Sequence, residues 1–324
     1  MLSMMQFTSV TLRTVLLAAL LAIGLAPPLA VAAPATGAPG QMTFASPEEA
    51  AAALIDAVKL GDQKQLFAVL GPGSEALTNS GDQNADAANR QKFVDSYNAQ
   101  HKLTEVGPGR DVLNVGANNW PFPMPVVQVN GRWQFDSSAG AQALIDRRIG
   151  RNEIAAIRVA LTYVDAQRDY FERSKQAGGT GEYAQRLIST PNRHDGLYWP
   201  AAAGEPESPF GPLVEQAIEE GYPGDIVSGR RIPYQGYYFR ILKAQGQNAP
   251  GGAKTYMAGG RMTGGFGLVA WPASYGVSGI MTFVVDQDGV VFQKDLGTGT
   301  AASAAAMTRC DPDVTWARVD VTSN

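Results

Sequence analysis

Residues 126–136, VVQVNGRWQFD, decide the fold of this chain. Valine and aromatic side chains stand on both sides of Asn130-Gly131, and Asn-Gly is the pair most typical of a two-residue turn between antiparallel strands. We therefore predict a β-hairpin here. Two shorter strands are predicted upstream, over residues 102–106 and 111–115, so that a curved antiparallel sheet extends to residue 136.

Helices are predicted before this sheet. Ser46 suits the N-cap of the first helix, Pro47 suits its first turn, and Glu49 completes a capping box. The apolar pattern predicts two further helices, the second of which carries Phe93 and Tyr97. Residues 44–138 are thus expected to form an N-terminal α+β domain.

The pattern turns helical again after the sheet. Residues 139–177 carry one apolar stripe and are predicted to form a long connecting helix, which we expect Gly150 to break or kink. Residues 178–234 are rich in proline and mostly irregular. One short helix is predicted there, from Leu213 to Glu220, capped by Ser208 with Pro209 in its first turn.

Strand-like segments dominate the last part, residues 235–324, where Asp288-Gly289 predicts a tight hairpin. This part is expected to pack with the long helix. The fold class is therefore α+β. The N-terminal part is similar to cystatin-like or nuclear-transport-factor-like domains, and the C-terminal part is similar to the head of pilins. Similarity of fold does not transfer function.

The first 33 residues have the features of a secretory signal peptide. Arg13 precedes an apolar run over residues 15–25, and Ala30-Val31-Ala32 places small residues before a cut after Ala32 or Ala33. The run is short for a membrane span. Residues 34–43 are then a flexible mature N-terminus, and the expected location is periplasmic or secreted.

Composition excludes several classes of function. The chain has 26 basic and 30 acidic residues, and removal of the signal peptide, which contains one basic residue, leaves a net charge of −5. Such a protein has no general electrostatic affinity for nucleic acid. The single cysteine, Cys310, cannot form an internal disulfide. Whether Cys310 is buried or pairs between chains, and the oligomeric state, stay open.

Several runs carry a resemblance to a known family: Trp120–Pro125, Arg147–Glu153, Asp195–Trp199, Arg261–Phe266, Trp271–Ala273, Tyr275–Gly279, Met281–Phe283 and Lys294–Gly297. Together they resemble a bacterial envelope family known as domain of unknown function 2950. The resemblance covers nearly all of the mature chain. It implies no activity and transfers no catalytic residue.

The sequence contains only weak candidates for catalytic and metal-binding residues. His194 and Asp195, with Ser189 or Ser208, contain the residue types of a nucleophile, base and orienter, but a solvated or turn-stabilising loop is the default explanation for them. The chain has two histidines and one cysteine, too few for a typical zinc site. Asp286–Gly289 hints at a calcium loop, yet Gly297 stands where the glutamate is needed. We expect no metal and no cofactor.

Candidates for a binding surface are more numerous than candidates for catalysis or metal binding. Aromatic side chains and one arginine at turn-rich boundaries suit sugar or peptide surfaces, although a structural role in the core is the simpler explanation for the aromatic ones. The candidates are Tyr198, Trp199, Tyr237, Arg261, Trp271 and Tyr275. A groove formed by Trp199 and Trp271 under the irregular segment is expected. The arginines of the long helix, Arg147, Arg148, Arg151 and Arg158, suit an anionic partner or a solvated face.

We therefore expect a non-enzymatic binding or assembly factor of the cell envelope, with an envelope protein or a glycan as partner. Two alternatives stay open. The first is a hydrolase acting on a periplasmic polymer through His194 and Asp195. The second is a small-ligand carrier whose N-terminal pocket is lined by Phe93, Tyr97, Trp120 and Trp133.

Overall fold

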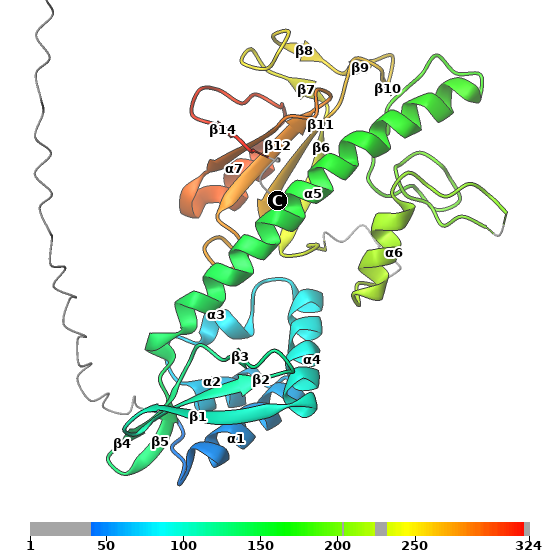
Figure 1. The fold of residues 1–324 in the computed structure, drawn as a ribbon. Helices are drawn as coiled ribbons and strands as arrows, with labels where there is room; N and C mark the ends of the chain where they lie inside the picture. The colour runs from blue at the N-terminus through cyan, green and yellow to red at the C-terminus, as the bar shows by residue number, and fades with distance from the viewer. Residues whose placement is uncertain (1–39, 203, 224–231, 321–324) are drawn as a thin grey trace, which may run out of the picture. The chain divides into compact units, whose positions relative to one another are not determined.

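A computed structural model describes residues 40–202, 204–223 and 232–320. The predicted signal peptide lies outside these residues. The described residues are of α+β class, and each pair of neighbouring strands among them is antiparallel (Figure 1). The finer similarities to cystatin-like and pilin-like folds, and the domain boundaries, stay predictions.

Four helices open the described chain: α1 (Pro47–Leu60), α2 (Gln63–Leu70), α3 (Glu75–Thr78) and α4 (Gln83–Ala99). The predicted capping box is present at α1, where the Ser46 hydroxyl accepts from the Glu49 N–H at 3.2 Å and the Glu49 carboxylate accepts from the Ala45 N–H at 3.0 Å. Asp62 and Asp82 cap α2 and α4 with their carboxylates.

The first sheet contains β1 (His101–Gly107), β2 (Arg110–Val115), β3 (Trp120–Pro121), β4 (Val126–Val129) and β5 (Arg132–Phe135). The strand order is β1-β2-β4-β5, and β3 pairs with β2. The predicted hairpin is confirmed. Val129 pairs with Arg132, and Asn130 and Gly131 take φ of 51° and 78°, the left-handed values that a two-residue turn requires.

A short 3₁₀ turn, η1 (Ser137–Ala139), leads into the long helix α5 (Ala141–Gln176). The expected break at Gly150 is wrong, because α5 is continuous over 36 residues (Figure 1). A glycine inside a helix costs only about 1 kcal/mol relative to alanine. Tertiary contacts of Ile149 and Asn152, both buried beside it, outweigh a cost of that size.

The proline-rich segment after α5 contains the helix α6 (Gly211–Glu219). Its start differs from the prediction: Phe210 is the N-cap residue, and Pro212 rather than Pro209 lies in the first turn. Ser208 accepts the Gly211 N–H through its backbone carbonyl, in a turn before the helix, so its hydroxyl does not cap α6. Two prolines three residues apart give the same signal in the sequence, and only one begins the helix.

The C-terminal sheet has the order β14-β13-β12-β11-β6. Its strands are β6 (Tyr237–Leu242), β11 (Gly267–Pro272), β12 (Met281–Asp286), β13 (Val291–Asp295) and β14 (Ala317–Arg318). Two small hairpins flank it, β7 (Ala244–Gln245) with β8 (Lys254–Thr255) and β9 (Met257–Ala258) with β10 (Arg261–Met262). The predicted Asp288-Gly289 hairpin is confirmed between β12 and β13, where Gly289 has a φ of 76°.

Each face of the C-terminal sheet has its own apolar cluster. Leu268 and Ala270 of β11 pack with Tyr163 of α5 on one face. Val269 and Trp271 pack on the other face with Ala304 of α7 (Thr300–Ala306), a helix preceded by the 3₁₀ turn η3 (Gly297–Gly299). This alternation follows from the two-residue period of a strand.

A third apolar cluster joins α1, α2 and α4 to the first sheet. It also includes Ala141 and Leu144 at the start of α5, so that α5 takes part in the cores at both of its ends. Within the described part of the chain, no helix has both the length and the apolar character to cross a bilayer.

Candidate functional site

The first core is not closed. A cavity of about 780 Å³, open to solvent, lies among α1, α2, α4, the first sheet and the start of α5. Its volume falls within the range of about 300–1,000 Å³ that is usual for small-molecule sites. Its deep wall is apolar and includes Leu54, Val58, Leu66, Leu70, Val115 and Phe122.

Aromatic rings form one side of the cavity. Phe93 of α4 lies 5.6 Å from Phe122, and Trp120 of β3 lies 6.3 Å from the same ring (centroid distances). Phe122 in turn contacts Phe135 edge-on at 6.0 Å, which fixes its orientation. Phe93 and Trp120 keep part of their surface exposed, so these two rings are available to a ligand.

Two of the four rings expected in a carrier pocket therefore line the cavity, and two do not. Tyr97 stacks on His101 with a centroid distance of 3.8 Å. Trp133 exchanges backbone hydrogen bonds with Phe44 outside the cavity. The four rings are all partly exposed, so they do not form one sealed core.

Cationic side chains gather around the apolar wall: Arg90, Lys92, Arg147, Arg148 and Arg151. Two carboxylates, Asp86 and Glu220, share the lining. The Asp86 carboxylate accepts from the Ser80 N–H at 2.9 Å, and the Glu220 carboxylate accepts from Gln216 and Gln235. The cavity is thus positively charged in a protein whose net charge is −4.

Each arginine of α5 has a distinct environment. The Arg148 guanidinium donates to the carbonyls of Ala76 at 2.6 Å and Leu77 at 2.8 Å, which joins α5 to α3. Burial lowers the pKa of Arg148, and the charge of Asp86 partly offsets that effect. Arg147 lies 5.7 Å above the Trp120 ring, in a cation–π contact. Partial burial also lowers the pKa of Arg151, although its side chain keeps an exposed surface.

The two residues that follow on α5 hold the C-terminal sheet. The Asn152 amide donates to the Ser278 carbonyl at 2.9 Å, and the Glu153 carboxylate accepts from the N–H groups of Ile280 and Met281. The run Arg147–Glu153 is therefore the place where one helix contributes to the cavity and to the second sheet. A solvated arginine face, one of the two predictions for this run, does not describe Arg148.

Asp82 joins α4 to the C-terminal part of the chain, a role that sequence analysis does not predict. It is fully buried, and its carboxylate caps α4 through the Ala85 N–H while accepting from the Tyr222 hydroxyl and the Gly236 N–H, both at 2.8 Å. Burial and the charge of Asp82 raise the pKa of Tyr222, which keeps the hydroxyl a donor. The cap signal of Asp82 was visible in sequence, but its partners lie 140 and 154 positions away.

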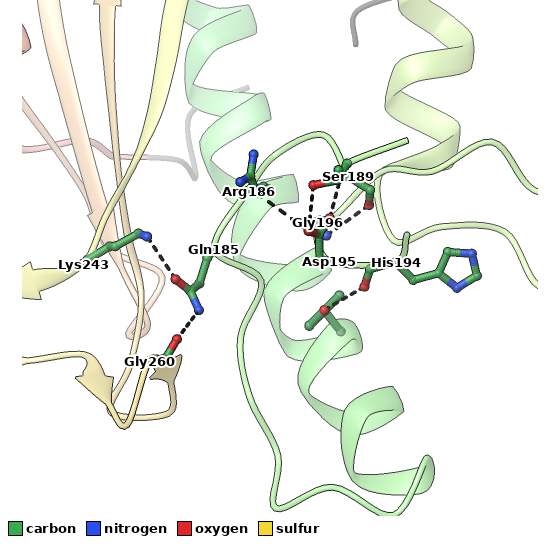
Figure 2. A network of polar contacts seen from close by, with 10 residues as sticks. Gln185, Arg186, Ser189, His194, Asp195, Gly196, Lys243 and Gly260 are labelled. Atoms are coloured by element: carbon green, nitrogen blue, oxygen red, sulfur yellow. Dashed lines mark hydrogen bonds and ion pairs between the residues drawn. The ribbon is translucent and has the colours of Figure 1, made fainter. Parts of the chain in front are cut away.

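The catalytic candidates are not assembled. The Asp195 carboxylate accepts from the N–H and the hydroxyl of Thr190 at 2.7 and 2.8 Å, and the Ser189 hydroxyl accepts from the Gly196 N–H (Figure 2). Burial acts to raise the pKa of Asp195, but the Thr190 hydrogen bonds and the charge of Arg186 hold it below its usual value.

The ring of His194 points away from Asp195 in Figure 2. It is exposed and stacks on Trp199 with a centroid distance of 4.3 Å. Within the described residues its ring has no hydrogen bond to Asp195 or Ser189. The Ser208 hydroxyl is buried without a hydrogen-bond partner among those residues, so neither serine meets a base.

The predicted aromatic surface is divided among different environments. Tyr237 is fully buried, and Trp199 and Trp271 are 8% and 3% exposed. Trp271 belongs to the cluster on the α7 face of the sheet, whereas the irregular segment reaches the α5 face through Leu197 and Phe210. The structure therefore does not bring Trp199 and Trp271 together in one groove.

The remaining predicted binding residues have local partners. Arg261 donates to the Thr180 hydroxyl and forms an ion pair with Glu182 at 3.9 Å. The Tyr275 hydroxyl donates to Asp295 at 3.0 Å, and Tyr198 is half-buried beside the second core. These contacts stabilise turns and do not define a shared site.

The described residues form no assembled site for metal binding or for thiol chemistry. No three of His, Cys, Asp and Glu come together there in a geometry that suits a metal ion. Asp286 closes the β12–β13 turn by accepting from the Asp288 N–H at 3.0 Å. Cys310 is buried at 1% exposure, and burial raises the pKa of its thiol.

A second cavity, of about 140 Å³, lies between α5, α6 and the second sheet. Its lining is apolar and includes Val159, Phe210, Val214, Phe239 and Leu268. It is smaller than the usual range for ligand sites. The charged, open cavity of the first core is therefore the candidate functional site.

Comparison with known proteins gives one match. The family described as Protein of unknown function (DUF2950) matches residues 41–319. No match was found among curated proteins or among solved structures. The matched range includes every residue of the cavity.

Proposed function

The chain belongs to the DUF2950 family of unknown function, and we propose that it is a non-enzymatic binding protein that holds a small molecule in the cavity of its first core. The observation that carries this proposal is an open cavity of about 780 Å³ with a deep apolar wall. Protein cores are normally packed without large voids, and apolar surface left open to solvent indicates a binding site.

Local contacts within the protein hold the walls of the cavity in place. Phe122 is held by Phe135, and Arg148 is held by two carbonyls of α3, so the walls of the cavity are fixed before any ligand binds. Asp82 fixes the start of α4, which supplies Phe93. Walls that are already ordered lower the entropy cost of binding.

Binding is favoured over catalysis by the state of the catalytic candidates. His194 is exposed and stacked, and the Asp195 carboxylate is occupied by Thr190. The proposed setting is the periplasm or the outside of the cell, which rests on the predicted signal peptide of residues 1–33. An envelope protein or glycan that receives or supplies the ligand is a natural partner for a carrier there.

The test uses N-phenyl-1-naphthylamine, a neutral apolar dye that fluoresces in apolar sites. We expect saturable binding with one dye per chain. The variant Ala88→Trp adds a large ring to an exposed position that lines the cavity, and we expect it to weaken dye binding at least fivefold. Ala87→Trp makes the same change at the neighbouring exposed position outside the lining and is the matched control.

Two results would overturn the proposal. The first is a folded protein that takes up the dye without saturation. The second is equal binding by the Ala88→Trp and Ala87→Trp variants, which would place the dye elsewhere. Circular dichroism of both variants shows whether each keeps its helices, so that loss of binding is separated from loss of fold.

A further inference from the structure

We infer that the ligand of this cavity is an amphiphile with one apolar tail and an anionic oxygen head group, a carboxylate or a phosphate. This inference rests on the proposed function and names the chemical class of its ligand. It follows from the separation of apolar and cationic side chains within one lining.

The apolar side chains lie deep in the cavity, and the cationic side chains lie at its opening. Leu54, Val115 and Phe122 are buried and form the deep wall. Lys92, Arg147 and Arg151 are exposed and lie where the cavity opens to solvent. A ligand that fills the cavity thus meets apolar surface at one end and positive charge at the other.

The cations at the opening are not neutralised by the protein. Lys92, Arg147 and Arg151 have no ion pair or side-chain hydrogen bond within the described residues, and the Arg147 guanidinium makes a cation–π contact with the Trp120 ring. Asp86 and Glu220 accept from other donors and form no ion pair in the described part. Arg148 has its own carbonyl partners.

Arg147 and Arg151 are spaced four residues apart on α5, so they project from the same face of the helix. Like charges at that spacing repel one another and destabilise the helix by a few tenths of a kcal/mol. An anion between them removes this repulsion. Guanidinium groups bind carboxylate and phosphate oxygens through paired hydrogen bonds, which gives these head groups an advantage over a thiolate or halide anion.

Arg90 has a different explanation. Its guanidinium lies over Gly61, the residue that ends α1. Positive charge is stabilised at the C-terminus of a helix. The inference therefore depends on Arg147 and Arg151, with Lys92 as a third contributor.

The experiment compares ligands that share a ten-carbon tail: decanoate, decyl phosphate and decan-1-ol. Each is titrated by calorimetry, the two anions below their micelle concentrations and the alcohol below its solubility limit. Inorganic phosphate supplies a head group without a tail. We expect both anions to bind at least tenfold more tightly than the alcohol, and inorganic phosphate to bind at least tenfold more weakly than decyl phosphate. The ratio of decanoate to decyl phosphate identifies which head group fits better.

The variant Arg147→Gln/Arg151→Gln should weaken the two anions about tenfold and leave decan-1-ol unchanged. Arg158→Gln is the matched control, because Arg158 is an exposed arginine of α5 outside the cavity. It should change no affinity. Raising the salt concentration should weaken the anions more than the alcohol, since screening acts on exposed charges.

The outcomes separate this inference from the proposed function. Equal affinity for the alcohol and the anions overturns the head-group inference and leaves the carrier proposal standing. Equal affinity for inorganic phosphate and decyl phosphate overturns the amphiphile in favour of a free anion. Binding of none of the tailed ligands, with no saturable uptake of the neutral dye, overturns both.

Discussion

The two apolar cores of this protein differ in how completely side chains fill them. In the C-terminal core, Tyr163, Tyr237 and Tyr256 are fully buried, and each hydroxyl donates to a specific oxygen at 3.0–3.1 Å. In the N-terminal core, Phe93 and Trp120 stay half-exposed around a cavity of about 780 Å³. The first arrangement favours stability, and the second leaves apolar surface for a ligand.

The largest expected effect comes from a matched pair of phenylalanines. Phe283 is 1% exposed in the closed core, and its change to alanine should lower the free energy of unfolding by about 3–5 kcal/mol, the usual cost of removing a buried ring. Phe93→Ala removes a half-exposed ring beside existing empty space, and we expect about 1 kcal/mol. Urea denaturation followed by circular dichroism measures both. Equal losses of unfolding free energy in the two variants would show that the cavity is not empty space in solution.

A second pair tests the link between the two regions. Asp62 and Asp82 both cap a helix, but only Asp82 also accepts from Tyr222 and Gly236. Asp62→Ala should cost about 1 kcal/mol, the usual value for an N-cap. Asp82→Ala should cost about 3 kcal/mol, because it also leaves buried donors without an acceptor.

The same urea denaturation distinguishes the two cases. If Asp82→Ala costs no more than Asp62→Ala, the contact between the regions contributes nothing to stability. If the contact does contribute, adding Tyr222→Phe to Asp82→Ala should cost less than Tyr222→Phe does alone, because the hydroxyl has already lost its acceptor.

Sequence predicts the parts of this fold that depend on neighbouring residues. The hairpin at Asn130-Gly131 and the capping box at Ser46 are set by a few adjacent side chains, and both are confirmed. The break expected at Gly150 is absent because propensity is a small local cost, and the packing of α5 that offsets it is tertiary. The start of α6 was misplaced because two nearby prolines give equal local signals.

The candidate site was predicted only in part, for the same reason. Phe93, Trp120, Arg147 and Arg151 were each recognised as chemically useful, but nothing in their sequence positions says that they line one cavity. Asp82 was recognisable as a helix cap and not as a partner of Tyr222. Long-range contacts decide both, and no local pattern encodes them.

The closed core also predicts a dependence on pH. Asp286 is 2% exposed, and one of its carboxylate oxygens has no hydrogen-bond partner within the described residues. Burial raises the pKa of Asp286 above its ordinary value of 3.8, although the Asp288 N–H acts against this. The folded state therefore holds its proton more tightly than the unfolded state. Its contribution to stability is full below pH 3.8 and is lost as the pH rises through the raised pKa.

Asp286→Asn keeps the shape of the protonated acid and cannot ionise. We expect its stability relative to the native chain to increase as the pH rises from about 4 toward neutrality. Thermal unfolding of both proteins across that range measures the difference. A constant difference at every pH would show that Asp286 titrates normally. Asp111 is a poor substitute here, because the charges of two other acids, Glu105 and Glu48, add to the effect of burial in raising its pKa.

The last pair tests whether burial, rather than aromatic content, makes the C-terminal region stable, and its His194 variant has the smallest expected effect. His194 and Trp199 stack on one another in that region, but His194 is exposed and Trp199 is 8% exposed. His194→Ala should change the free energy of unfolding by less than about 1 kcal/mol, the usual limit for an exposed stacked ring. Trp199→Ala should cost about 3–5 kcal/mol. If the two substitutions cost the same in urea denaturation, the stacked pair acts as a unit, and the contrast between an open and a closed core does not extend to this loop.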